Sequence, residues 1–280
     1  MRRAGTLATV AVAAVTLAGC GSAGGHLTGG RPGPAKDTPA SPLEAVNAAY
    51  TATTKAKTAK IAPDTTVRAQ EHTVHSSGAG VMDLGGRKMT LTMTLPNGQS
   101  QQMRMTDGKE YVEMPPQTRA QLPHHARWLA VDLDKVAKQR FGASLSQLRG
   151  KRSVTHSLAY LRDSSKVTKL DEKTIRGVST TGYKVVVNLD KAAKQRKNAA
   201  TRKAIHKVEK MLGSHSMPVK VWLDKQHRVR REAVSIPVHL PKGGKATTDT
   251  TTDLYGFGTP LHVKVPPESQ TISLSELRSR

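Results

Sequence analysis

The chain carries a single thiol, and its cysteine occupies a distinctive position. Cys20 is the only cysteine in 280 residues, so it is the only thiol available for acylation or nucleophilic attack. The segment before it begins with Arg2 and Arg3, continues as an apolar run from Leu7 to Leu17, and ends in small residues. This succession predicts an export signal cleaved just before Cys20, since a membrane span needs about 20 apolar residues.

The four residues at this site, Leu17-Ala18-Gly19-Cys20, resemble the lipobox of bacterial lipoproteins. In that family a diacylglycerol is joined to the cysteine sulfur, and fatty acids such as palmitate then anchor the protein. The resemblance implies lipidation at Cys20 and residence at the extracytoplasmic face of the cell membrane. The alternative is an ordinary signal peptide followed by a chance cysteine. Arg2-Arg3 suggests a twin-arginine route, but the residues after the pair fit it poorly, so the Sec route is expected.

Other groupings that could support catalysis or metal binding are weak. Among 11 histidines, His124 and His125 are adjacent, and His72 and His75 fall on opposite sides of a predicted strand. We found no further His, Asp or Glu at a recognisable zinc spacing from them. The sequence also contains no Gly-x-Ser-x-Gly elbow. We therefore expect no metal, no cofactor and no enzymatic activity.

The charge balance indicates anionic partners. The formal net charge is +23, or +21 without Arg2 and Arg3, and such an excess attracts anions. For an exported, tethered protein the nearest anions are phospholipid headgroups and acidic wall polymers. Aromatic residues make up only 3% of the chain, and we found no nucleic-acid-binding motif. Nucleic acid is therefore not an expected partner, because single-strand binders stack bases on aromatic side chains.

Three segments are predicted along the chain. Residues 1–19 form the lipoprotein signal peptide, and residues 20–40, rich in glycine and proline, form a flexible tether. A flexible coil of this length spans about 25 Å on average. Residues 41–280 form a single domain. Its stability has to come from a hydrophobic core, because no second cysteine is available for a disulfide. That core has to be largely aliphatic, because aromatic residues make up only 3% of the chain.

Helical and strand patterns alternate within this domain. Ser41-Pro42-Leu43-Glu44 predicts a helix start with a capping box, and the helix should run to about Lys60. From residue 65 the period changes to two, which is typical of strands. Lys88–Leu95 is the clearest case, and Asn97-Gly98 and Asp107-Gly108 predict the turns that follow it. Further strands are expected at 109–114, 128–132, 166–170, 174–189, 217–223, 228–238 with a bulge near 230–231, 246–254 and 262–265.

Residues 190–212 are predicted to form one strongly basic helix. The narrow apolar stripe of Ile205, Val208 and Leu212 would face the domain. The opposite face is either an ordinary solvated surface or a surface that binds anionic lipid or polymer. The candidates for anion binding are Lys191, Lys194, Arg196, Lys197, Arg202, Lys203, Lys207 and Lys210.

Several short stretches together resemble the LppX/LprG group of actinobacterial lipoproteins. They are Asp107–Val112, Trp128–Asp132, the hairpin within Val219–Val238 and the segment Tyr255–Pro267. The resemblance covers residues 41–270 in order of elements. It implies the LolA-like fold, an α+β domain in which an open, curved antiparallel half-barrel sheet carries helices packed on its concave side. It also implies a cavity for acyl chains between sheet and helices.

Methionines in consecutive strands suit such a cavity, because their flexible side chains adapt to ligands of varying shape. Ordinary core packing explains the same pattern. The cavity candidates are Met89, Leu91, Met93, Leu95, Met103, Met105, Val219, Val221 and Leu223. The first functional hypothesis is a lipoprotein that binds or transfers a lipid or other hydrophobic ligand. The second is a tethered sensor or scaffold that binds a partner protein or an anionic wall polymer without enclosing a ligand.

Overall fold

The computed structural model describes residues 41–70, 72–142, 144, 164–194, 198–239 and 244–278. The predicted signal peptide, the tether and Cys20 therefore lie outside the described residues. Within these ranges the chain forms an α+β structure built on one open sheet of twelve strands. No helix in the described part has both the length and the apolar character needed to cross a bilayer.

The first six strands form the predicted antiparallel meander, but its first strand begins at Thr58, before residue 65, where the strand pattern was expected to start. Gly98 and Gly108 both have φ of 77°, and Asp107 has φ of 51°. These left-handed conformations are those that tight hairpin turns require, which explains the Asn-Gly and Asp-Gly pairs. The strands are β1 (Thr58–Ala69), β2 (His72–Asp83), β3 (Met89–Thr94), β4 (Ser100–Thr106), β5 (Lys109–Glu113) and β6 (Trp128–Asp132).

The remaining strands extend this sheet on both sides. They are β7 (Ser164–Ile175), β8 (Val178–Asn188), β9 (Ser216–Leu223), β10 (Val229–His239), β11 (Lys245–Tyr255) and β12 (Thr271–Ser273). The spatial order is β12-β6-β5-β4-β3-β2-β1-β11-β10-β9-β8-β7, and only the β12–β6 pair is parallel. The predicted bulge is confirmed, because the β9–β10 register shifts between Val229 and Arg231. The strand expected at 262–265 is absent, and there the Lys264 carbonyl accepts a hydrogen bond from Arg104.

Helix α1 (Pro42–Thr54) begins as predicted and ends earlier than predicted. The Ser41 hydroxyl oxygen accepts a hydrogen bond from the Glu44 backbone N–H at 3.2 Å. The expected extension to Lys60 is wrong, since the chain enters β1 at Thr58. Pro63 lies inside β1, and the β1–β2 pairing lapses at residues 62 and 63. A proline has no N–H to donate to a neighbouring strand, which accounts for this gap.

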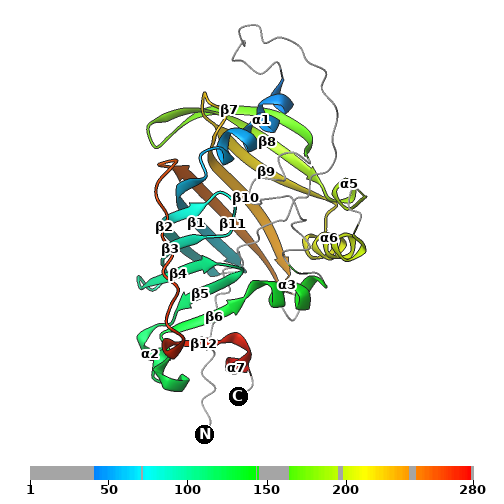
Figure 1. Ribbon diagram of the computed structural model, residues 1–280. Coiled ribbons are helices and arrows are strands. Elements are labelled where there is room, and N and C mark those ends of the chain that lie inside the picture. Colours follow the sequence, from blue (N-terminus) through cyan, green and yellow to red (C-terminus); the bar gives the residue numbers. More distant parts are fainter. Residues whose placement is uncertain are drawn as a thin grey trace.

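The single basic helix expected at 190–212 is two helices, α5 (Leu189–Lys194) and α6 (Ala199–Leu212). The Asn198 side chain accepts a hydrogen bond from the Thr201 N–H at 3.1 Å and thereby caps a new helix start. The other helical elements are α2 (Pro116–Arg119), η1 (Pro123–His125), α3 (Leu133–Phe141), η4 (Glu268–Gln270) and α7 (Leu274–Arg278). Figure 1 shows the sheet curving around the side on which α1, α5 and α6 lie.

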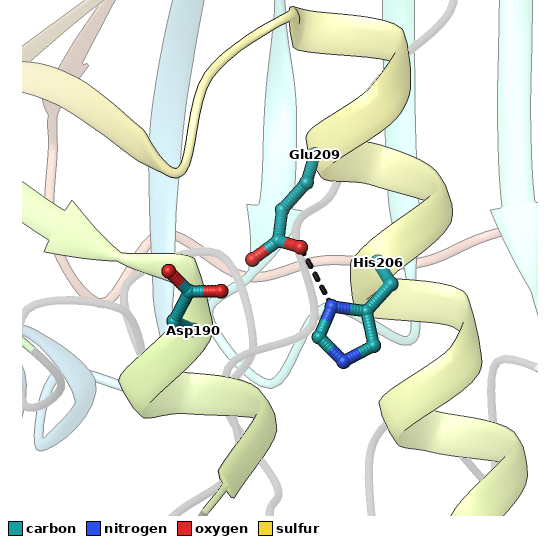
Figure 2. A group of neighbouring side chains, drawn as sticks. All are labelled: Asp190, His206 and Glu209. Atoms are coloured by element: carbon teal, nitrogen blue, oxygen red, sulfur yellow. Dashed lines mark hydrogen bonds and ion pairs between the residues drawn. The ribbon is translucent and has the colours of Figure 1, made fainter.

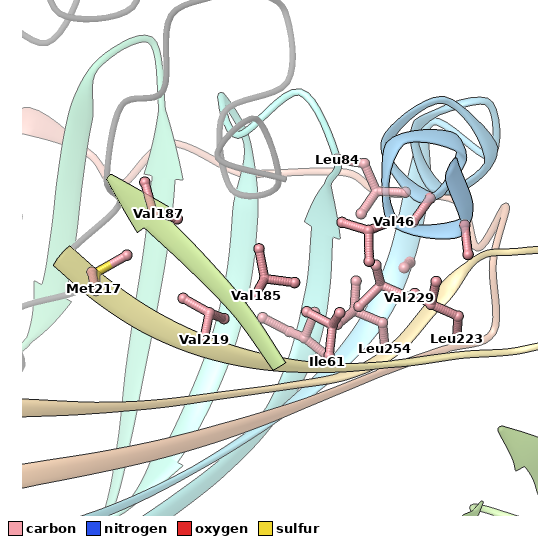
Figure 3. Close-up of a cluster of buried hydrophobic side chains, with 14 of the residues drawn as sticks. Val46, Ile61, Leu84, Val185, Val187, Met217, Val219, Leu223, Val229 and Leu254 are labelled. Carbon is pink, nitrogen blue, oxygen red and sulfur yellow. The ribbon is translucent and has the colours of Figure 1, made fainter. Parts of the chain in front are cut away.

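The main hydrophobic core lies between the sheet and helices α1 and α6. Val46 of α1 is fully buried, and Figure 3 shows it beside Leu84, Val229 and Leu254 of the sheet side. Full burial of one such side chain contributes about 1.5–3 kcal/mol. From α6, the half-buried residues Ile205, Val208 and Leu212 pack against the same cluster. The predicted apolar stripe of this helix therefore faces the sheet.

Candidate ligand site on the concave face

One face of the sheet carries the buried apolar side chains of the main core, and we call it the concave face because α1 and α6 cover it. Leu91 of β3 lies opposite Met103 of β4, and Met89 lies opposite Met105. Met103 in turn lies opposite Val112 of β5. Opposed residues in an antiparallel sheet project from the same face. The alternation therefore produces a row of methionines across neighbouring strands.

The nine residues predicted to line a cavity differ in their degree of burial. Six of them are buried members of the main core, namely Leu91, Met93, Met103, Val219, Val221 and Leu223. Met89, Leu95 and Met105 are half-buried. The concave face thus has a filled part, which includes the β9 residues, and a less covered part around β3 and β4. Whether these side chains contact a ligand stays a prediction.

Gly78 of β2 lies opposite Met93 and explains how this bulky row is accommodated. A Cβ at Gly78 would lie 2.5 Å from the Met93 Sδ atom and 2.8 Å from the Thr92 carbonyl oxygen. Any side chain there would displace the methionine or the neighbouring strand. The glycine therefore lets Met93 lie flat across β2.

Glu110 of β5 is a carboxylate on this apolar face that the sequence analysis did not single out. It lies opposite Met105 of β4 and Val131 of β6, and so shares the face of Val112. Within the described residues its side chain has neither a hydrogen bond nor an ion pair. Burial among these neighbours raises its pKa above the ordinary value of 4.5. The alternation of Glu110, Val112 and Met114 was the signal that could have revealed it.

Replacing Glu110 with glutamine should raise the melting temperature at pH 7. Between pH 4.5 and the raised pKa, the folded protein holds a proton that the unfolded chain has lost, so the free energy of unfolding decreases as pH rises through this window. The variant lacks this titration, and its advantage should disappear below pH 4.5. Melting curves at both pH values check this, with Glu268→Gln as a matched charge removal at an exposed position. An equal effect at both pH values would contradict it.

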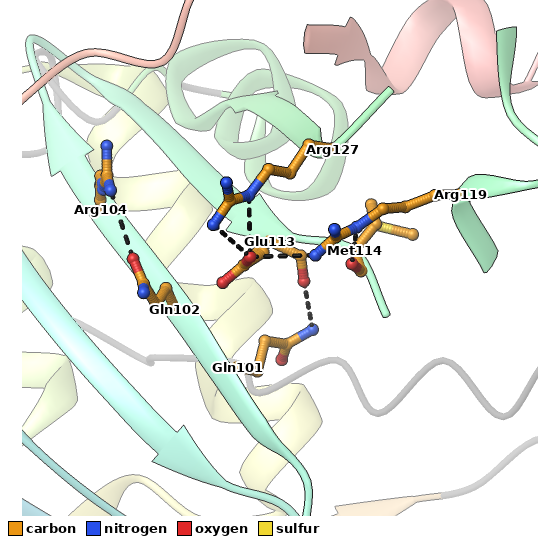
Figure 4. A network of polar contacts seen from close by, with 7 residues as sticks. All are labelled: Gln101, Gln102, Arg104, Glu113, Met114, Arg119 and Arg127. Atoms are coloured by element: carbon orange, nitrogen blue, oxygen red, sulfur yellow. Dashed lines mark hydrogen bonds and ion pairs between the residues drawn. The ribbon is translucent and has the colours of Figure 1, made fainter. Parts of the chain in front are cut away.

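The opposite face of the sheet, which we call the convex face, is more polar than the concave face. Figure 4 shows the Glu113 carboxylate of β5 between Arg119 and Arg127, with an ion pair of 2.9 Å to each. Arg119 belongs to α2 and Arg127 directly precedes β6, so the two ion pairs connect both segments to β5. A hollow of about 190 Å³ lies here, beneath the C-terminal segment. It is lined by Thr90, Leu91, Thr92, Gln102, Met103, Arg104, His262 and Lys264. Most of this lining is polar, but Leu91 and Met103 of the concave face border the hollow as well.

The residues predicted to bind anions occupy the helices α5 and α6. Lys191, Lys194, Lys203 and Lys210 are exposed there. The Lys207 ammonium instead donates a hydrogen bond to the Arg140 carbonyl of α3 at 3.2 Å. Arg202 is half-buried, and Arg196 and Lys197 lie outside the described residues. The exposed cations form a basic surface on this helix pair, which we call the α5–α6 surface.

Comparison with protein-family models and with curated proteins found no match. Among solved structures, the chain is similar to mycobacterial lipoproteins and a LolA superfamily protein. The lipoprotein LppX of Mycobacterium tuberculosis matches at 13% identity over 80% of this chain and 98% of that chain, with a TM-score of 0.48. LprF of Mycobacterium bovis matches at 10% identity over 80% and 96%, with a TM-score of 0.41.

A LolA superfamily protein of Nitrosomonas europaea matches at 10% identity over 80% of this chain and 94% of that chain, with a TM-score of 0.30. The group that the sequence resembles is thus represented among the structural matches. At these identities the likeness is one of fold. Function has to be argued from the residues of this chain.

Proposed function

We propose that this protein is a lipid-anchored lipoprotein of the extracytoplasmic membrane face that binds or transfers a lipid or other hydrophobic ligand. Residues 1–19 direct export, the acylated Cys20 holds the protein at the membrane, and residues 20–40 connect the anchor to the domain at 41–280. The ligand contacts the less covered part of the concave face. It has an acyl chain or an equally apolar body. The protein catalyses no reaction in this proposal.

The observation that supports the proposal best is the half-buried apolar surface beside the filled core. Met82, Met89, Met105 and Val112 share the concave face and all remain partly exposed. Apolar surface left in contact with water favours an apolar partner. The methionines suit a ligand of variable shape, because their side chains repack at little cost. Glu110, in its protonated form, could donate a hydrogen bond to an ester or carboxyl oxygen of the ligand.

Titration of the purified protein with a fluorescent fatty-acid probe tests this function. We expect saturable binding with an enhanced emission, because the probe moves from water into an apolar site. Unlabelled fatty acid or phospholipid should displace it. Absence of saturable binding would contradict the proposal and favour the tethered sensor or scaffold, which encloses no ligand.

The α5–α6 surface should bring the domain to anionic phospholipid. Binding to vesicles that contain an anionic lipid is expected to weaken steeply between low and high salt, because exposed charges are screened over about 8–10 Å at physiological ionic strength. Co-sedimentation of the protein lacking its acyl anchor measures this. Lys203→Glu combined with Lys210→Glu should abolish the salt-dependent part, and neutral vesicles serve as the control. Salt-insensitive binding, or none, would leave these helices as an ordinary solvated surface.

A further inference from the structure

Four metal-binding side chains meet where α5 and α6 approach the start of β9. Asp190 is near the start of α5, His206 and Glu209 lie three residues apart on one face of α6, and His215 precedes β9. Ligand atoms of the first three all lie within 4.8 Å of one another. Figure 2 shows the Asp190 and Glu209 carboxylates and the His206 ring turned toward a common point.

His215 lies beside two of these residues and is a fourth candidate ligand. Its Nδ1 atom lies 3.2 Å from Asp190 Oδ2 and 3.9 Å from Glu209 Oε1. The His215 carbonyl also accepts a hydrogen bond from the Leu189 N–H at 2.9 Å, which fixes the loop against α5. The donor set is therefore two imidazole nitrogens and two carboxylates, supplied by three separate elements.

Glu209 gives a second and independent indication of a ligand. Its side chain is only 7% exposed, and its Oε1 atom is buried without a hydrogen-bond partner. The other oxygen, Oε2, lies 2.6 Å from His206 Nδ1. A buried carboxylate oxygen without a partner is costly, and a second carboxylate facing it adds repulsion. A cation at the common point would relieve both.

We propose that Asp190, His206, Glu209 and His215 bind one divalent transition-metal ion, with Zn²⁺ as the best match. Two imidazoles and two carboxylates form a donor set that zinc accepts in tetrahedral geometry. At ligand distances of about 2.1 Å, neighbouring ligand atoms lie about 3.4 Å apart. The closest pairs are 2.6 Å (His206 Nδ1 to Glu209 Oε2), 3.2 Å (His215 Nδ1 to Asp190 Oδ2) and 3.9 Å (His215 Nδ1 to Glu209 Oε1), so side-chain adjustments would bring the four ligands around one ion. The bound ion would fasten α6, which covers part of the concave face, to α5 and β9.

Calorimetric titration of the metal-freed full-length protein with ZnCl₂ tests this site, at about 0.15 M salt to screen the surrounding lysines. We expect one ion per chain and a raised melting temperature in its presence. Asp190→Asn and His206→Asn alter side chains that are 45% and 53% exposed, so both variants should fold. Mutating a residue that only hydrogen-bonds a metal ligand typically lowers metal affinity roughly 10- to 100-fold. Each of these two variants removes a ligand itself, so zinc affinity should decrease by at least that factor.

The matched control is His72→Asn, which removes an exposed histidine of β2 far along the chain from the group. It should bind zinc with the affinity of the unmodified protein. Equal binding by all variants would assign the ion to scattered surface histidines and overturn the proposal. Absence of binding at micromolar zinc, with folded protein, would overturn it as well.

Discussion

Replacing Cys20 with alanine should detach this protein from the membrane or leave its signal peptide uncleaved. Cys20 is the only thiol in the chain, so no second cysteine can take over acylation. A single acyl chain gives only marginal, reversible membrane binding, whereas a diacylglycerol with a further acyl group anchors stably. Loss of all these chains should therefore change partitioning by orders of magnitude.

Detergent phase partitioning of whole-cell protein measures this effect. The unmodified protein should enter the detergent phase, and the Cys20→Ala variant should move to the aqueous phase or run as the longer, uncleaved chain. Thr28→Ala, a change of similar size in the predicted tether, serves as the control and should leave partitioning unaltered. An unchanged distribution for the Cys20→Ala variant would refute lipid anchoring at this residue.

Filling the less covered part of the concave face should abolish ligand binding without unfolding the protein. Met105 is half-buried between Met89 and Glu110, so a tryptophan at this position can project into the space that a ligand would use. We expect Met105→Trp to melt close to the temperature of the unmodified protein and to lose at least about tenfold in affinity for the fatty-acid probe, a loss of about 1.4 kcal/mol.

Val221→Trp provides the contrast within the same face. Val221 is fully buried in the main core, and overpacking a filled interior costs typically about 1–3 kcal/mol. This variant should therefore melt well below the unmodified protein. If Met105→Trp is destabilised as strongly as Val221→Trp, or binds the probe normally, the ligand does not occupy the face around Met105.

Local turn chemistry explains why much of the sheet could be predicted from the sequence. Asn97-Gly98 and Asp107-Gly108 specify hairpin turns by their own backbone preferences, and they fix the register of the strands on either side. Register then determines which residues share a face, so the common face of Leu91 and Met103 followed from their alternation. The bulge beside Arg230 was visible in the same way, as a break in the alternation.

Features that depend on distant partners could not be predicted in this way. Residues 262–265 alternate like a strand but pair with no strand of the described part of the chain, and the Lys264 carbonyl instead accepts a hydrogen bond from the Arg104 side chain. The prediction of one continuous basic helix was wrong because Asn198 caps the start of a second helix, α6. This capping role depends on the local path of the chain. The proposed metal ligands come from α5, α6 and the residue before β9. In the sequence, only the spacing of His206 and Glu209, three residues apart, indicated them.

Mass spectrometry of the protein purified from its own host tests the central claim of hydrophobic-ligand binding most directly. A covalent anchor on Cys20 persists when the protein is denatured, whereas a ligand on the concave face is lost. We predict that the native mass exceeds the denatured mass by that of a lipid, and that Met105→Trp removes the difference. Identical native and denatured masses, even after incubation with lipids extracted from the host membrane, would contradict the claim.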